Sequence, residues 1–199
     1  MGQESGLRER KKEQTKRELF AHALRLFEAK GFDETTIEDI AAAANVAPRT
    51  FFRYFATKEK LFSLGQEEED ETLRATLASR RPGEDDISLL LRAFHAMLKL
   101  EHIDPKQSGV MMAVVLNTPS LRARTLEEML RMERLIAEGL VGRKASRAEM
   151  LRARMLASAA ISMFFTALLV WVEDGQKGDP FEAVEASAPL LRTGFVRRG

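Results

Sequence analysis

Apolar residues recur at helical spacing along most of the chain, whereas the alternation typical of β-strands is nearly absent. Near the start, Phe20, Ala23, Leu24 and Phe27 share one helical stripe, which ends just before Gly31. Glycine readily adopts the left-handed conformation that closes many helices, so the first helix should end there. The pattern predicts an all-α protein.

Capping signals mark the starts of further helices. A capping side chain is followed by proline at Asp104-Pro105, Thr118-Pro119 and Asp179-Pro180. The segment "RRPGEDD" interrupts the pattern near residue 80. Beyond it, we expect helices at about 87–102, 105–117, 119–141, 146–174 and 180–195.

Two capping boxes and one further N-cap can also be assigned. The spacings Thr35 to Glu38 and Ser146 to Glu149 predict the boxes. The first box would open a short helix that ends at Asn45, a residue type that tolerates positive φ. Thr57 predicts the N-cap of a longer helix running toward Ser79.

Composition narrows the class of protein. With 199 residues, 45% of them hydrophobic, the chain can bury a sizeable core. A net charge of +1 points to no partner by itself, and the absence of cysteine excludes disulfides and cysteine-based metal or redox chemistry. The first twenty residues hold no apolar run that could be a signal peptide, so a cytoplasmic protein is expected.

One uncharged run, from Met155 to Val172, is about as long as the roughly 20 residues that cross a bilayer. It could be a membrane anchor or a helix buried in a bundle or between subunits. It is rich in Ala and Ser, and charged residues flank it closely on both sides. We therefore favour burial and expect no membrane association.

The segment "NVAPRTFFRYFATKEKLF", residues 45–62, interleaves aromatic and basic residues. Three short helices in the first sixty residues, the last two joined by a tight turn, fit a helix-turn-helix. Ile40, Phe51 and Phe55 can then pack inward against the first helix. The outer face of the third helix would present Arg49, Thr50, Arg53 and Tyr54, residue types that contact bases and phosphates.

The stretch "TTIEDIAAAANVAPRTFFRYFATKEKLF" resembles the DNA-binding signature of TetR-family transcriptional regulators, a likeness that covers about residues 8–64. Within that family, the helix beginning near Pro48 enters the major groove. The resemblance implies that these residues face DNA: Thr36, Pro48, Arg49, Thr50, Phe52, Arg53, Tyr54 and Lys58, with Thr36 and Lys58 on phosphates.

The same resemblance points to a basic arm and to two departures. Residues before the first helix resemble the arms that some members lay along the DNA backbone: Arg8, Arg10, Lys11 and Lys12. Ala47 stands where many members have a capping Ser, and Phe52 stands where Tyr is common. The third helix therefore lacks a side-chain cap, and one phosphate-bonding hydroxyl is lost.

The second half of the chain is rich in methionine, which suits an adaptable apolar pocket but also serves as ordinary core filler. The segment "MMAVVLNTPSLRARTLEEMLRMERLIAEGL" resembles the C-terminal domain of TetR-family members assigned acyl-CoA-like ligands. The lining that we predict for a ligand pocket is Phe94, Met97, Met111, Met112, Met129, Met132 and Phe164, with Arg122, Arg124 or Arg131 at its mouth.

No nucleotide-binding or catalytic motif is present, and His95 and His102 lack a carboxylate pattern that would complete a metal site. We therefore predict no enzymatic activity, no cofactor and no metal. Residues 1–64 should form the DNA-binding domain, and residues 65–199 a helical domain for ligand binding and dimerisation. The predicted function is a homodimeric repressor that a small hydrophobic ligand releases from a palindromic operator. The alternatives are a DNA-bound adaptor that recruits a protein, and an all-α enzyme fused to a DNA-binding module.

Overall fold

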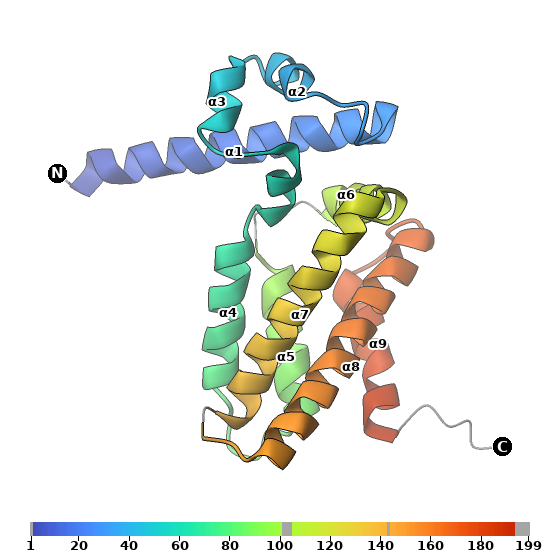
Figure 1. Cartoon of the computed structure of the whole chain (residues 1–199). Helices are drawn as coiled ribbons and strands as arrows, with labels where there is room; N and C mark the ends of the chain where they lie inside the picture. Colours follow the sequence, from blue (N-terminus) through green and yellow to red (C-terminus); the bar gives the residue numbers. More distant parts are fainter. Residues whose placement is uncertain (1, 101–104, 143, 194–199) are drawn as a thin grey trace. The chain divides into compact units, whose positions relative to one another are not determined.

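The computed structural model describes residues 2–100, 105–142 and 144–193 (Figure 1). Across these ranges the chain forms α-helices and one 3₁₀ helix, without a strand, so the all-α prediction is confirmed. The elements are α1 (Gly2–Lys30), α2 (Ile37–Ala43), α3 (Pro48–Phe52), η1 (Lys58–Ser63), α4 (Gln66–Ala78), α5 (Asp86–Leu98), α6 (Pro105–Asn117), α7 (Pro119–Val141), α8 (Arg147–Glu173) and α9 (Pro180–Thr193).

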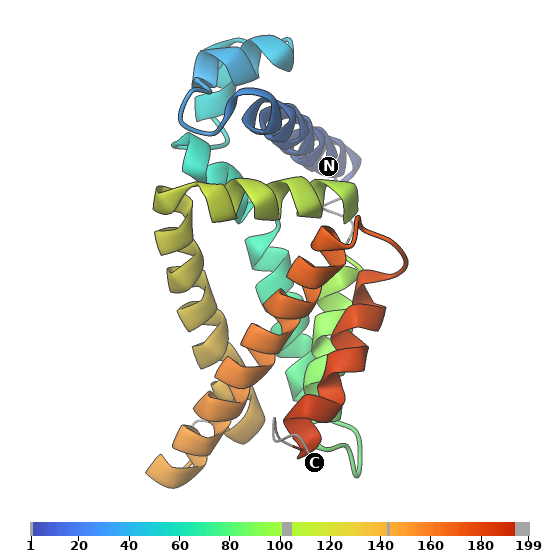
Figure 2. The same ribbon diagram turned by 90° about the vertical axis from the view of Figure 1, so that its right-hand side faces the viewer.

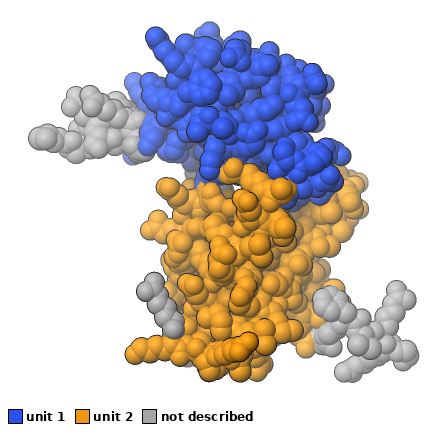
Figure 3. Space-filling model, in the orientation of Figure 1, with its two compact units in different colours: residues 1–65, 102–122 blue, residues 66–101, 123–199 orange. Residues whose placement is uncertain are grey.

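The chain folds into two compact units (Figure 3). Unit 1 comprises residues 1–65 and 102–122, and unit 2 comprises residues 66–101 and 123–199. Helix α6 therefore belongs to unit 1, although it follows α4 and α5 in sequence. The division of the protein into functional domains at residue 64 stays a prediction.

In unit 1, α2 and α6 pack against α1, and α3 packs against α2 (Figure 2). As predicted, α1 stops at Gly31, whose φ is +89° and whose amide donates to the Phe27 carbonyl at 2.9 Å. The buried cluster contains the inward residues expected from the sequence, among them Phe20, Leu24, Phe27, Phe32, Ile40, Phe51 and Phe55. Amphipathic spacing thus identified this core correctly.

The capping box of α2 lies one residue later than predicted. Thr36, not Thr35, is the N-cap, and its partner is Asp39, not Glu38. Thr35 is buried, and its hydroxyl donates to the Gly31 carbonyl at 2.7 Å, so it closes the end of α1 instead of opening α2.

The single helix expected from Thr57 toward Ser79 is in fact two elements. Thr57 makes no side-chain cap, η1 winds as a 3₁₀ helix, and Gly65 has a φ of +83° before α4 begins. Leu61 within η1 and Leu64, the extended residue that ends it, are both buried in the core of unit 1.

Unit 2 is a bundle of α4, α5, α8 and α9 with most of α7 (Figure 1). The helix bounds agree with those predicted within one residue, except that α5 ends about four residues earlier. The predicted end of α9, at residue 195, lies outside the described residues. The capping box at Ser146 and Glu149 is present as expected. The core is formed by Leu73, Leu77, Leu89, Leu90, Ala93, Phe94, Met132, Ile136, Ala157, Ala160, Ile161, Met163, Phe164, Ala167 and Val184.

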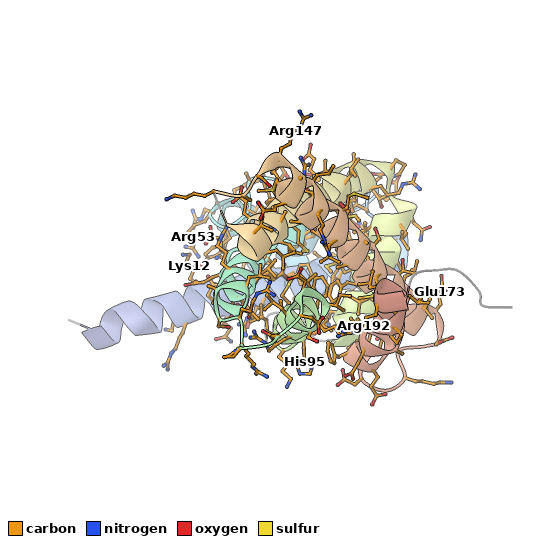
Figure 4. All side chains as sticks on the ribbon, turned by 90° about the horizontal axis from the view of Figure 1, so that it is seen from below. Lys12, Arg53, His95, Arg147, Glu173 and Arg192 are labelled. Carbon is orange, nitrogen blue, oxygen red and sulfur yellow. The ribbon has the colours of Figure 1, made fainter. Side chains whose placement is uncertain are left out.

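Charged and polar residues link the start of α5 to the last turn of α9. Arg192 of α9 donates to the Asp85 carboxylate at 3.1 Å and to the Ser88 hydroxyl at 2.8 Å (Figure 4). Hydrogen bonds from Ser88, with a smaller contribution from Arg192, lower the pKa of Asp85 to about 2. Beside it, hydrogen bonds from Arg92 lower the pKa of Glu84 to about 2.

By length and apolar composition, α8 is the one helix of the described ranges that could cross a bilayer. Its inner face contributes buried residues to the core of unit 2, such as Ala160, Ile161 and Phe164. Only 33% of its most apolar stretch is buried within the chain. The outer face of α8 is therefore largely uncharged and uncovered.

Candidate nucleic-acid interface

The segment that contains α3 is positioned by two buried phenylalanines. Ala47 begins the helix in an extended conformation without a side-chain cap, as predicted, and Pro48 occupies the first turn. Phe51 is fully buried and Phe55 nearly so, with ring centroids 5.6 Å apart. Because α3 spans only five residues, these contacts rather than helix propensity determine how it is presented.

The predicted base-reading residues lie together on the outer side of this segment. Pro48, Arg49, Phe52 and Arg53 are exposed, while Thr50 and Tyr54 are half-buried. Phe52 keeps 53% of its surface exposed, so its ring lies outside the core beside the two arginines.

Arg53 is ordered by its neighbour. Its guanidinium donates to the Tyr54 hydroxyl at 2.7 Å and lies 4.6 Å from the centre of the tyrosine ring. Cation–π and hydrogen-bonding contacts restrict the rotamers of the arginine before it meets any ligand. Arg49 and Phe52 flank this pair on α3, so residues 48–54 form a compact surface with cationic, aromatic and hydroxyl groups.

The two residues expected on phosphates have their polar groups engaged within the protein. The Thr36 hydroxyl donates to Asp39 at 2.7 Å, and the same carboxylate accepts from Lys30 at 2.5 Å. Hydrogen bonds from Lys30 and then Thr36 hold the pKa of Asp39 well below its usual range. Lys58 donates to carbonyl groups of the loop between α1 and α2.

The basic residues expected before the first helix lie within it, because α1 already begins at Gly2; Arg10, Lys11 and Lys12 are exposed on its N-terminal half. The side chain of Arg8 lies outside the described residues, as does His102, so the spacing of His95 and His102 is not described. Within the described part of the chain, no group of three or more possible metal ligands occurs.

The predicted ligand-pocket residues fall into two groups. Phe94, Met132 and Phe164 are buried in the core of unit 2, where Met97 and Met129 pack against them. The rings of Phe94 and Phe164 stack with centroids 4.5 Å apart. Met111 packs instead against the core of unit 1, and Met112 is half-buried on α6 of the same unit.

The basic residues predicted at the pocket mouth differ in their surroundings. Arg131 on α7 pairs with Glu128 and with Asp70 of α4, and the Gln66 amide donates to Glu128 at 2.6 Å. Although burial opposes it, these carboxylates raise the pKa of Arg131 above its ordinary value. Arg122 donates to the Leu116 carbonyl at 3.3 Å. An anionic ligand could engage Arg131 only by competing with two carboxylates.

Unit 1 also has an open cleft of about 510 Å³ between α6 and the end of α1. Buried Phe27, Phe32 and Val114 line its floor, and Glu28 and Glu34 lie at its edge. This mixed apolar and acidic lining does not match the apolar pocket that the sequence predicts.

Comparison with known proteins identifies the fold and the family. Residues 16–63 match the model of bacterial regulatory proteins of the tetR family, and residues 85–196 match that of the MftR C-terminal domain. The chain belongs to the TetR family of transcriptional regulators. The regulator TcmR of Streptomyces glaucescens is 39% identical over 145 residues, which are 70% of this chain and 64% of TcmR, less than two thirds of that protein.

Two further TetR-type relatives match most of the chain. The putative mycofactocin biosynthesis regulator MftR of Mycobacterium tuberculosis is 27% identical over 88% of both proteins. The TetR-family repressor FadR of Thermus thermophilus, solved in complex with lauroyl-CoA, is 26% identical and has a TM-score of 0.55. That comparison covers 92% of this chain and 96% of the FadR chain.

Proposed function

We propose that this TetR-family regulator is a cytoplasmic repressor that binds a palindromic operator as a homodimer and is released by a small apolar ligand. The observation that carries the DNA-binding part is the exposed surface of residues 48–54. Phe51 and Phe55 support this surface from the core, and no acidic residue occurs within it. A rigid cationic segment of this kind suits the major groove.

The residue types of this surface suggest distinct contacts. Arg49 and Arg53 can each donate two hydrogen bonds to guanine, and the hydroxyls of Thr50 and Tyr54 can bond phosphates or base edges. Phe52 has no hydrogen-bonding group, so its exposed ring suits an apolar contact such as a thymine methyl group.

Dimerisation is supported by the outer face of α8. Leu151, Met155 and Val170 are large and exposed there, and Leu190 is exposed on α9. Pairing of α8 and α9 with their symmetry mates in a four-helix bundle would cover these side chains. The dimer would present two recognition surfaces to half-sites about one DNA turn apart.

The ligand part rests on the aromatic and methionine cluster of unit 2. Phe94 and Phe164 stack there, and the partly buried Met97 and Met129 can change rotamer to admit an apolar guest. The complex of T. thermophilus FadR with lauroyl-CoA supports a long-chain acyl thioester as the first class to test.

Selection from a randomised duplex pool, followed by anisotropy titration of the recovered sequence, tests the DNA-binding part. Arg49→Ala and Arg53→Ala should each cost about 1–3 kcal/mol and relax base preference at one position of each half-site. Arg134→Ala removes the same charge from an exposed position of α7 in unit 2 and is the matched control. Wild-type affinity in both α3 variants would mean that another surface reads the DNA.

Titration with acyl-CoAs of increasing chain length, with and without operator, tests the ligand part. If a ligand weakens operator binding a hundredfold, linkage requires operator to weaken ligand binding equally, by about 2.7 kcal/mol. If the affinity did not depend on the length of the acyl chain, the proposal of an apolar pocket would be wrong. If an acyl-CoA bound without changing operator affinity, the proposal that the ligand releases the operator would be wrong.

One observation favours the adaptor as a second candidate. Leu126 and Leu130 lie one turn apart on α7 and remain 59% and 47% exposed. A protein partner could cover this pair, and Leu126→Glu would then abolish that contact while leaving operator affinity unchanged.

A further inference from the structure

Lys58, at the start of η1, is directed into unit 1. Its ammonium donates to three backbone carbonyls, those of Phe32 at 2.6 Å, Thr35 at 3.0 Å and Asp33 at 3.2 Å. The same nitrogen lies 4.3 Å from the centre of the Phe32 ring. A lysine ammonium has three N–H donors, and here each has an acceptor.

The carbonyls that Lys58 binds all belong to the loop between α1 and α2. Phe32 in this loop is buried, and its ring lies 4.9 Å from that of Phe27 and 6.0 Å from that of Phe62. Lys58 and Phe62 both belong to η1, so this short 3₁₀ helix contacts the loop both through the loop's backbone carbonyls and through the aromatic side chain of Phe32.

The loop in turn sets the position of the DNA-reading segment. It leads directly into Thr36, the N-cap of α2, and α2 packs against α3. Loss of the ammonium would leave the carbonyls of residues 32, 33 and 35 without this donor at the entrance to α2. A displaced α2 would carry α3 with it.

We propose that Lys58 is a positioning residue that holds the loop before α2, and thereby the recognition surface of α3, rather than a residue that neutralises a DNA phosphate. This inference rests on the proposed function of α3. A direct phosphate contact would require the ammonium to leave loop carbonyls that it binds in the free protein. Base contacts tolerate displacements of only about 0.5 Å, so the effect of Lys58 falls on specific binding.

Three variants of the full-length protein separate the two roles. Lys58→Met removes the charge and keeps the chain length. Lys58→Arg keeps the charge but presents a planar guanidinium, which cannot serve three converging carbonyls from one nitrogen. Lys60→Met removes the charge of an exposed lysine from the same η1 helix and serves as the matched control.

Binding is measured against salt concentration, with a duplex selected by this protein and a scrambled duplex of the same composition, at a temperature where every variant is folded. A positioning role predicts that Lys58→Met and Lys58→Arg both lower the ratio of specific to non-specific affinity about tenfold or more, with the salt slope unchanged. A phosphate contact predicts that Lys58→Met reduces the salt slope by about 0.9 and that Lys58→Arg retains wild-type binding. The second outcome would overturn the proposal.

Hydrogen exchange on the free protein separates failure of this inference from failure of DNA binding. The amides of Thr35 and Thr36, which donate to the Phe32 carbonyl and the Asp39 carboxylate, should exchange at least tenfold faster in Lys58→Met than in wild type, while Lys60→Met matches wild type. Unchanged protection in Lys58→Met would refute the loop contact whether or not the protein binds DNA. Faster exchange in a protein that binds no duplex would instead contradict the proposed function.

Discussion

A single arginine on the outer face of α8 should dissociate the dimer without unfolding the chain. The exposed residues of this face recur every four positions or so: Leu151, Met155, Ser158, Ser162, Thr166 and Val170. At 1.5 Å per residue this stripe is about 28 Å long, and from Met155 onward it carries no charge. Ser162 lies near its middle, so Ser162→Arg places a cation where two α8 helices would meet.

The expected loss of affinity follows from symmetry. An isologous interface contains each substitution twice, so Ser162→Arg buries two like charges that lack partners. At about 3 kcal/mol for each unpaired charge, the dimer loses roughly 6 kcal/mol. With 1.4 kcal/mol per decade, the dissociation constant should rise by about four orders of magnitude.

Light scattering coupled to size exclusion measures this effect at micromolar concentration. Wild type should have twice the chain mass of 22.4 kDa, and Ser162→Arg should approach 22.4 kDa with its helical content and cooperative unfolding retained. Ser162→Ala should behave as wild type. Ala160→Arg is the contrasting control, since Ala160 is fully buried in the core of unit 2 and a charge there should prevent folding.

Two results would refute this reasoning. A wild-type protein that is monomeric at this concentration would exclude a stable dimer. A Ser162→Arg variant that keeps the doubled mass would show that the dimer forms through another surface, such as the exposed leucines of α7.

Two further predictions concern the packing and the acid stability of unit 2. A Cβ on Gly139 of α7 would lie 2.6 Å from Leu77 Cδ1 and 3.0 Å from Leu77 Cβ, so Gly139→Ala should destabilise the protein by about 1–3 kcal/mol. Thermal unfolding would show a melting temperature lower by roughly 2–4 °C per kcal/mol, and Leu77→Ala should be less than additive with it. The pKa values of Glu84 and Asp85, about 2, lie below their ordinary values of 4.5 and 3.8. The contacts of the two carboxylates therefore stabilise the folded state fully at a pH above these ordinary values. This stabilisation is lost as the pH falls toward 2. The melting temperatures of Glu84→Gln and wild type should therefore differ at pH 7 and converge near pH 2; a gap that stayed constant with pH would contradict this.

Helix ends were predictable where the residues next to the helix end are enough to determine it. The starts of α6 and α7 match those expected because Pro105 and Pro119 each follow a residue of a capping type and favour the first turn of a helix. The capping box of α2 was misplaced because Thr35 and Thr36 are both followed three residues later by an acid. Only the burial of Thr35 against Gly31 decides between them, and that contact depends on how α1 and the loop pack.

The ligand lining was harder to infer for a related reason. Helical spacing indicates that Met97, Met111 and Met132 face some core, but it does not indicate which one. Met111 joins the core of unit 1 because α6 packs along α1, a contact between residues far apart in sequence. The cluster of Phe94, Met132 and Phe164 was identifiable because all three fall on strongly apolar stripes of unit 2.

The difference between local and long-range determinants also applies to the predicted DNA-binding residues. It separates the six residues of the α3 surface from the two expected on phosphates. Pro48, Arg49, Phe52 and Arg53 are exposed because Phe51 and Phe55 turn the other side of this segment into the core, and that amphipathic pattern is local. For Thr36 and Lys58, the direction of the polar group is decided by its acceptors. The hydroxyl of Thr36 donates to the carboxylate of Asp39, three residues later in the chain. The ammonium of Lys58 instead donates to three backbone carbonyls that lie 23 to 26 residues earlier. Family resemblance can therefore assign a residue to the DNA-binding unit, but the atoms that its polar group contacts must be established from the fold. In this chain those atoms are backbone carbonyls of the loop that leads into α2, the helix against which α3 packs.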